Sequence, residues 1–113
     1  NKIIRIRSKK DSNGEMTPYW EFIHEQQEEY IDIPLRVLAG FSCNQIDDNA
    51  FQLKYSNGEL IIDDLSSQYE FTMVLDGKEK PLYGQIITRI ETKTKLLAVC
   101  KKSGVRHEIE IEV

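Results

Sequence analysis

Long hydrophobic runs are missing from this 113-residue sequence. The longest apolar run, Leu96–Cys100, is far shorter than the roughly 18 residues that a membrane-spanning helix needs. The first residues, from Asn1 to Arg5, also lack the hydrophobic core of a signal peptide. We therefore expect a soluble, intracellular protein that has no membrane partner.

Cysteine, proline and glycine are scarce, with two, three and six residues respectively. Two cysteines are too few for a disulfide framework, and Cys43 and Cys100 both have apolar neighbours, so we expect buried thiols. So little proline and glycine excludes a collagen-like or strongly disordered chain. A chain of this length can build one hydrophobic core, which predicts a single β domain over residues 1–113.

Residues that carry chemistry are equally few. His24 and His107 lie in separate predicted strands and have no cysteine or carboxylate at zinc-ligand spacing. His24 shares a predicted face with aromatic residues, which favours a partly buried, hydrogen-bonded ring. Adjacent acidic residues such as Asp63 and Asp64 would point to opposite faces of a strand and could not share a proton. The glycines are scattered and form no phosphate-binding motif. We expect no catalytic residue, no metal and no cofactor, and hence a protein that is not an enzyme and has no small-molecule substrate.

Alternation of apolar and polar residues is the commonest pattern in the sequence, and it is typical of half-buried strands. It predicts strands over residues 4–7, 19–24, 51–55, 59–62, 68–75, 82–91, 95–101 and 105–113. Asn57-Gly58 and Asp76-Gly77 separate pairs of these strands and predict hairpin turns. The fold class is therefore mostly β, a small antiparallel β-barrel or sandwich of seven to eight strands with at most one or two short helices.

Two segments interrupt the alternation. The polar stretch from Ser8 to Pro18 predicts a long loop. The stretch from Tyr30 to Gly40 is ambiguous, because it begins with strand-like alternation while Pro34 could start a short helix that ends at Gly40. The expected core comprises Trp20, Phe22, Phe51, Leu53, Tyr69, Phe71, Ile87, Leu97 and Val99.

Charge is distributed unevenly along the chain. Residues 1–10 carry five basic and no acidic groups, whereas residues 11–70 carry two basic and 13 acidic groups. The acidic middle would repel phosphate backbones, and it favours either a basic partner or simple solubility. The basic start, with Arg5, Arg7 and Lys9 among its residues, could instead contact nucleic acid beside aromatic rings that stack on bases.

The last strand alternates strictly from His107 to Val113. It places Ile109, Ile111 and Val113 on one face and three glutamates on the other. A terminal strand that pairs on one side only exposes backbone groups, and this one has no lysine, proline or bulge to protect it. We therefore expect another chain to complete this edge. The glutamates should meet water or basic residues, of which Lys93, Lys95, Lys101 and Lys102 are the candidates.

Four features resemble the chromosome transmission fidelity protein 8 family, small subunits of the alternative replication clamp loader. These are an opening strand followed by a tryptophan strand from Trp20 to Gln26, the stretch Leu82–Ile87 followed by Glu91 and an apolar strand, a similar length, and the all-β character. Gln85 stands where the family more often has lysine, and a basic C-terminal tail is absent after Val113.

The resemblance implies a non-catalytic subunit of a larger complex in DNA replication and sister-chromatid cohesion. It implies half of an intertwined barrel that a partner subunit completes, with Trp20, Tyr83 and Gly84 at the interface, and a nuclear location. Together with Ile109, Ile111 and Val113, these residues form the expected partner interface. Two alternatives stay open, a barrel that binds single-stranded nucleic acid and a free-standing acidic inhibitor or immunity protein.

Overall fold

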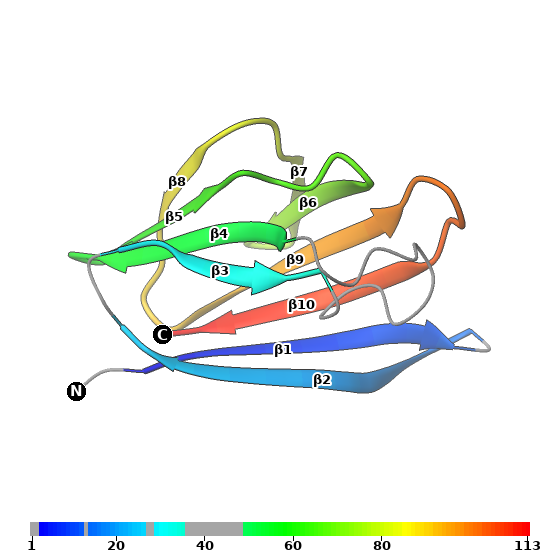
Figure 1. Cartoon of the computed structure of the whole chain (residues 1–113), viewed down its shortest axis with the longest axis horizontal. Coiled ribbons are helices and arrows are strands. Elements are labelled where there is room, and N and C mark those ends of the chain that lie inside the picture. Colours follow the sequence, from blue (N-terminus) through cyan, green and yellow to red (C-terminus); the bar gives the residue numbers. More distant parts are fainter. Residues whose placement is uncertain (1–2, 13, 27–28, 36–48) are drawn as a thin grey trace.

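The computed structural model describes residues 3–12, 14–26, 29–35 and 49–113, and these residues form ten strands in two antiparallel sheets (Figure 1). The first sheet has six strands in the order β2-β1-β10-β9-β6-β7, and the second has four in the order β3-β4-β5-β8. The six strands are β1 (Ile3–Ser12), β2 (Glu15–Glu25), β6 (Tyr69–Leu75), β7 (Lys78–Pro81), β9 (Lys93–Cys100) and β10 (Arg106–Glu112). The other four are β3 (Ile31–Pro34), β4 (Asn49–Ser56), β5 (Glu59–Asp63) and β8 (Ile86–Arg89).

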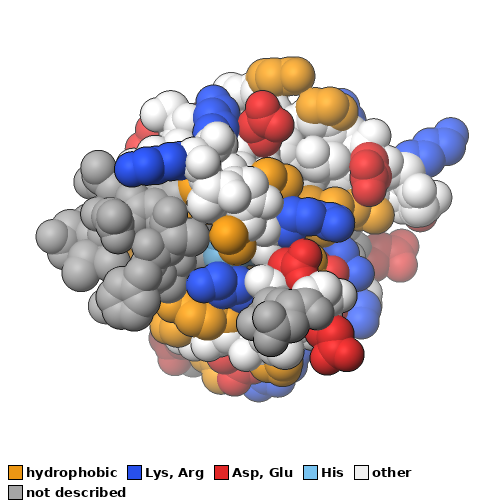
Figure 2. Space-filling view, turned by 90° about the vertical axis from the view of Figure 1, so that its right-hand side faces the viewer, with side chains coloured by type: hydrophobic (Ala, Val, Ile, Leu, Met, Phe, Trp, Pro, Cys, Tyr) orange, Lys and Arg blue, Asp and Glu red, His pale blue; other side chains and the backbone are white. Residues whose placement is uncertain are grey.

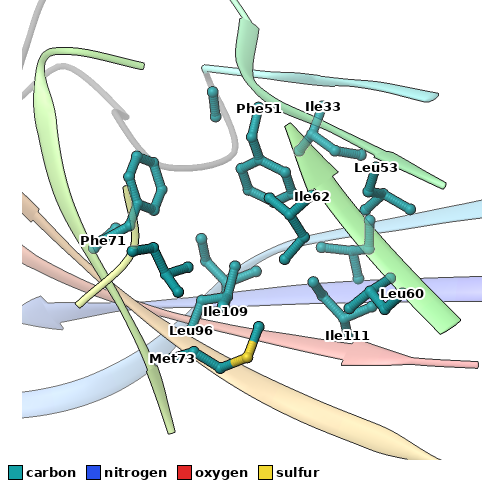
Figure 3. Packing of buried hydrophobic residues seen from close by; sticks show 14 of the residues in the cluster. Ile33, Phe51, Leu53, Leu60, Ile62, Phe71, Met73, Leu96, Ile109 and Ile111 are labelled. Carbon is teal, nitrogen blue, oxygen red and sulfur yellow. The ribbon is translucent and has the colours of Figure 1, made fainter. Parts of the chain in front are cut away.

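One hydrophobic cluster lies between the two sheets. Figure 3 shows side chains of β3, β4 and β5 pointing toward those of β6, β9 and β10. Phe51 and Phe71, one from each sheet, meet edge to face with ring centroids 6.0 Å apart. Buried and exposed residues alternate along the strands, which confirms the expected mostly β, antiparallel architecture, but the described residues form ten strands and not the expected seven to eight. No helix occurs among the described residues, and so none of them forms one able to span a membrane.

Both expected hairpin turns are confirmed. Asn57 and Gly58 have φ angles of 53° and 79°, and Asp76 and Gly77 have φ angles of 51° and 76°. Positive φ at both central residues is the type I′ geometry that suits the twist of two antiparallel strands. The first turn joins β4 to β5 and the second joins β6 to β7.

The long loop expected between Ser8 and Pro18 is wrong. This stretch continues β1 and begins β2, so the two strands pair from Ile3↔Glu25 to Ser12↔Glu15. Most residues from Gly14 to Pro18 are exposed, which accounts for their polar composition. The register shifts between Ser8 and Lys9, and Pro18 lies in an edge strand, where its missing N–H is tolerated.

Two other expectations about the chain need correction. Leu97 and Val99 were expected in the core, but they lie on the partly exposed face of β9 together with Lys93 and Lys95. Their neighbours Leu96 and Ala98 are the buried residues. The two lysines lie on the same face of β9 as Leu97 and Val99. Because lysine side chains favour the solvent side of a sheet, this face is the outer one.

The expected thiol at Cys100 is also wrong. Cys100 is buried and disulfide-bonded, while Cys43 lies outside the described residues. The helix expected after Pro34 falls largely on residues 36–40, which also lie outside the described part of the chain.

Candidate protein-interaction site

Each sheet has two edge strands, and these differ in how well they are protected against pairing with another chain. β7 is protected, because Lys78, Lys80 and Pro81 supply the charges and the missing N–H that discourage pairing. β3 ends at Pro34, which has no backbone N–H to donate to an added strand. The described residues therefore leave two edges without such protection, β8 and the second half of β2.

β8 carries an exposed hydrophobic residue at an open sheet edge. Ile86 points inward and pairs with Ile62, whereas Ile87 pairs with Ile61 on the outer face and is 57% exposed. The expectation that Ile87 belongs to the core is therefore wrong. No described strand pairs with the other side of β8. An incoming strand could bond to that edge and cover Ile87.

Tyr83 lies in the connection from β7 to β8, shortly before β8 begins. Tyr83 is 84% exposed, the highest value among the large hydrophobic residues described. Gly84 follows it with a φ of 66°, a conformation that glycine adopts without strain. The Gln85 side-chain nitrogen donates to the Tyr30 hydroxyl at 3.2 Å and to an Asp63 carboxylate oxygen at 3.4 Å. These bonds tie the connection to the second sheet and leave the Tyr83 ring in solvent.

A cleft of about 460 Å³ lies next to Tyr83. It is bounded by the β5–β6 connection, by β6 and by the start of the β7–β8 connection. Its lining residues include Leu65, Phe71, Leu82, Tyr83 and Lys101. We define the 82–87 surface as Tyr83, Gly84, Ile87 and the open edge of β8; the cleft adjoins it at Tyr83 and Gly84. This surface brings together two of the residues expected at an interface, Tyr83 and Gly84.

The last strand does not belong to this surface. β10 pairs with β1 on one side and with β9 on the other, so the expected open edge is wrong. Ile109 and Ile111 are fully buried between the sheets and are core residues. Val113 is partly buried against the core, and its backbone N–H donates to the Thr92 carbonyl at 2.8 Å. The sequence could not reveal this pairing, because the partner β1 lies at the opposite end of the chain.

The expected surroundings of the glutamates are confirmed in part. The Lys95 ammonium nitrogen lies 3.0 Å from a Glu108 carboxylate oxygen, and the Lys93 ammonium nitrogen lies 4.0 Å from a Glu110 carboxylate oxygen. Arg7 was not anticipated in this role. Its guanidinium contacts Glu110 at 3.0 Å and, on the other side, Glu21 at 2.9 Å.

These contacts join the three neighbouring strands β2, β1 and β10. They pair the charge of Arg7 with carboxylates of the same chain. Glu112 also lies 3.9 Å from the same guanidinium. The hydrogen bond with Glu21 is the main cause that raises the pKa of Arg7 above its ordinary value, although partial desolvation acts in the opposite direction. Figure 2 shows that charges of both signs are likewise mixed over one end of the molecule, with hydrophobic side chains between them.

Trp20 lies on β2 within a row of aromatic rings. Trp20 and Phe22 stack with centroids 5.5 Å apart, and Phe22 and His24 stack at 5.7 Å. All three side chains are partly buried. The His24 Nδ1 atom lies 2.7 Å from the Glu25 carbonyl oxygen, so the expected partly buried, hydrogen-bonded ring is confirmed. Trp20 is thus on a different edge from Tyr83, at the opposite side of the first sheet from β7.

His107 is fully buried in the core, and among the described residues neither ring nitrogen has a hydrogen-bond partner. It pairs with Lys10 of β1, and its ring meets the Tyr69 ring edge to face with the centroids 5.8 Å apart. Burial, and secondarily the charge of Lys10, lowers the pKa of His107 from 6.5 to about 4. Within the described ranges, no three His, Cys, Asp or Glu side chains gather into a group that could hold a metal ion.

Comparisons with known proteins give no relative for this chain. No protein-family model matches it, and no curated protein and no solved structure is found to be similar.

Proposed function

We propose that this protein is a non-catalytic interaction module that binds another protein through the 82–87 surface. The observation that carries the proposal is the exposure of Tyr83, shortly before β8, and of Ile87 within β8, together with the unprotected edge of that strand. Exposed aromatic and aliphatic residues next to a pocket are the kind that anchor protein interfaces. A strand added to β8 would gain backbone hydrogen bonds, and Ile87 would give it a place for an apolar side chain.

We also propose that the two sheets form a sandwich and not a closed barrel. No ladder joins the two sheets among the described residues, and each sheet ends in its own pair of edge strands. A sandwich with its own core would not need a partner to complete it. The partner would then be added at an edge, which differs from the intertwined barrel implied by the family resemblance.

The role in a clamp loader stays a proposal that depends on the sequence resemblance alone. Its signature stretch, Leu82–Ile87, coincides with the 82–87 surface, and this agrees with a role in binding a protein. The disulfide at Cys100 is typical of oxidising compartments, and it counts against this role and against the nuclear location that the resemblance implies.

The nucleic-acid alternative receives no specific observation in its favour. Arg7 already contacts three carboxylates, and the Lys10 ammonium lies 5.9 Å from the centre of the Tyr19 ring. The inhibitor alternative is a form of protein binding, and the identity of the partner would distinguish it. Only protein binding is therefore proposed here.

The test compares tagged variants that are used to capture a partner from cells that make the protein. We expect a protein that binds the unaltered chain to be lost with Ile87→Glu and weakened with Tyr83→Ala. Lys78→Glu, a change at the protected edge β7, is the control and should retain the partner. Equal binding by all three variants would contradict the proposal.

A further inference from the structure

The second unprotected edge, the half of β2 from Trp20 to Glu25, lies far along the sheet order from β7 and belongs to a different sheet from β8. The first half of β2 is protected by Pro18 and by the irregular pairing at Ser8 and Lys9. The second half contains no proline and no lysine, and no described strand pairs with its outer side. Ile23 on this half is 50% exposed.

The sequence of this half is complementary to itself. When two copies of β2 pair antiparallel about Phe22, a two-fold axis perpendicular to the sheet brings together residues of the same face. Phe22 then faces Phe22 of the other copy, and Trp20 faces His24. On the outer face Glu21 lies opposite Ile23. No two acidic residues are opposite one another in this arrangement.

Charge selects this register over its neighbours. Pairing about Ile23 would place Glu21 opposite Glu25, and pairing about Glu21 would place two copies of that residue against each other. Like charges directly opposite destabilise a strand pair, whereas aromatic pairs stabilise it. In the register about Phe22, the ring row of Trp20, Phe22 and His24 continues into the ring row of the second copy.

We propose that a second copy of this chain occupies the β2 edge, with the two β2 strands antiparallel about Phe22. The two six-stranded sheets then form one continuous sheet across the dimer. Glu21 on the outer face keeps its ion pair within each chain, because Arg7 lies 2.9 Å from it. The 82–87 surface is left open in each copy, so the dimer does not depend on the proposed function.

Sedimentation velocity over a concentration series of the full chain tests this proposal with two opposite substitutions at one exposed position. In the register about Phe22, residue 23 of each copy lies opposite Glu21 of the other copy. Ile23→Glu therefore places two glutamates directly opposite each other at two places in the dimer. It should raise the dimer dissociation constant about tenfold, since like charges directly opposite destabilise a strand pair and an apolar contact is also lost. Ile23→Lys places a charge opposite in sign to Glu21 at the same site and should weaken the dimer less than Ile23→Glu does.

Ile87→Glu is the matched control, because it makes the same change at an exposed isoleucine on another edge. It should leave the dimer intact while it removes the partner of the 82–87 surface. The proposal is overturned if the unaltered chain stays monomeric at every concentration, if Ile23→Glu and Ile23→Lys weaken the dimer equally, or if Ile87→Glu abolishes it. Circular dichroism of each variant confirms that its strands have formed before the comparison is made.

Discussion

Acidification should destabilise this protein through one residue, His107. Its side chain is fully buried, and within the described part of the chain neither ring nitrogen has a hydrogen-bond partner. The charged form is disfavoured by desolvation first and by the charge of Lys10 second, so the pKa falls from 6.5 to about 4 in the folded state. Protonation therefore favours the unfolded chain, in which the ring is hydrated.

The sign and the size follow from linkage. A folded pKa below the unfolded value means that the unfolded chain binds the proton first as the pH falls below 6.5. The stability that His107 provides when neutral is complete above that pH and is lost as the pH falls toward about 4. Between about pH 7 and pH 5 the loss is about 2 kcal/mol, and it approaches about 3 kcal/mol below the folded pKa.

Urea unfolding at a series of pH values measures this loss. His107→Leu keeps a similar volume and cannot titrate, so its free energy of unfolding should fall less as the pH decreases. The difference between the two proteins removes the contribution of the carboxylates, which also begin to titrate near pH 4. Parallel pH profiles for the two proteins between pH 7 and pH 5 would refute the reasoning.

Three further predictions concern packing, the turn geometry and the surface. Leu96→Ala should lower the free energy of unfolding, measured with urea, by about 2 to 5 kcal/mol because Leu96 is fully buried. Leu97→Ala on the outer face should lower it by under about 1 kcal/mol. Equal losses would contradict the assignment of Leu96 to the buried face. Gly58→Ala should destabilise by roughly 1 kcal/mol or more, because φ is +79° and a Cβ would lie 3.1 Å from an Arg89 nitrogen; an unchanged melting temperature would contradict this. Tyr83→Ala should leave unfolding within about 0.5 kcal/mol of the unaltered chain, because the ring is 84% exposed, and a larger loss would show that it packs against the fold.

The sequence predicted local structure well and long-range pairing poorly. Asn57-Gly58 and Asp76-Gly77 determine their turns through the φ angles of those residues, so both hairpins could be read directly. The pairing of β10 with β1 joins the two ends of the chain, and no local pattern reports it. The C-terminal strand was therefore predicted to be an open edge when it is an interior strand.

The candidate site was predicted in part for a similar reason. Tyr83 and Gly84 were expected at an interface because of the family resemblance, and they lie in the connection that leads into β8, which has an open edge. Ile87 was assigned to the core because it is apolar and lies in a β-rich run. Two adjacent isoleucines in a strand point to opposite faces, and the sequence does not show which of Ile86 and Ile87 faces the second layer. Arg7 was missed because its carboxylate partners come from β2 and β10.

Site-specific photocrosslinking tests the central claim, that the 82–87 surface binds a protein, most directly. A benzophenone amino acid is placed at Ile87 and, in a separate protein, at Lys78 on the protected edge β7, and both are irradiated in cells that make the protein. The account predicts a crosslink to one protein from Ile87, the same protein that is lost with Tyr83→Ala, and no such crosslink from Lys78. The same crosslinked protein from both positions, or none from Ile87, would contradict it.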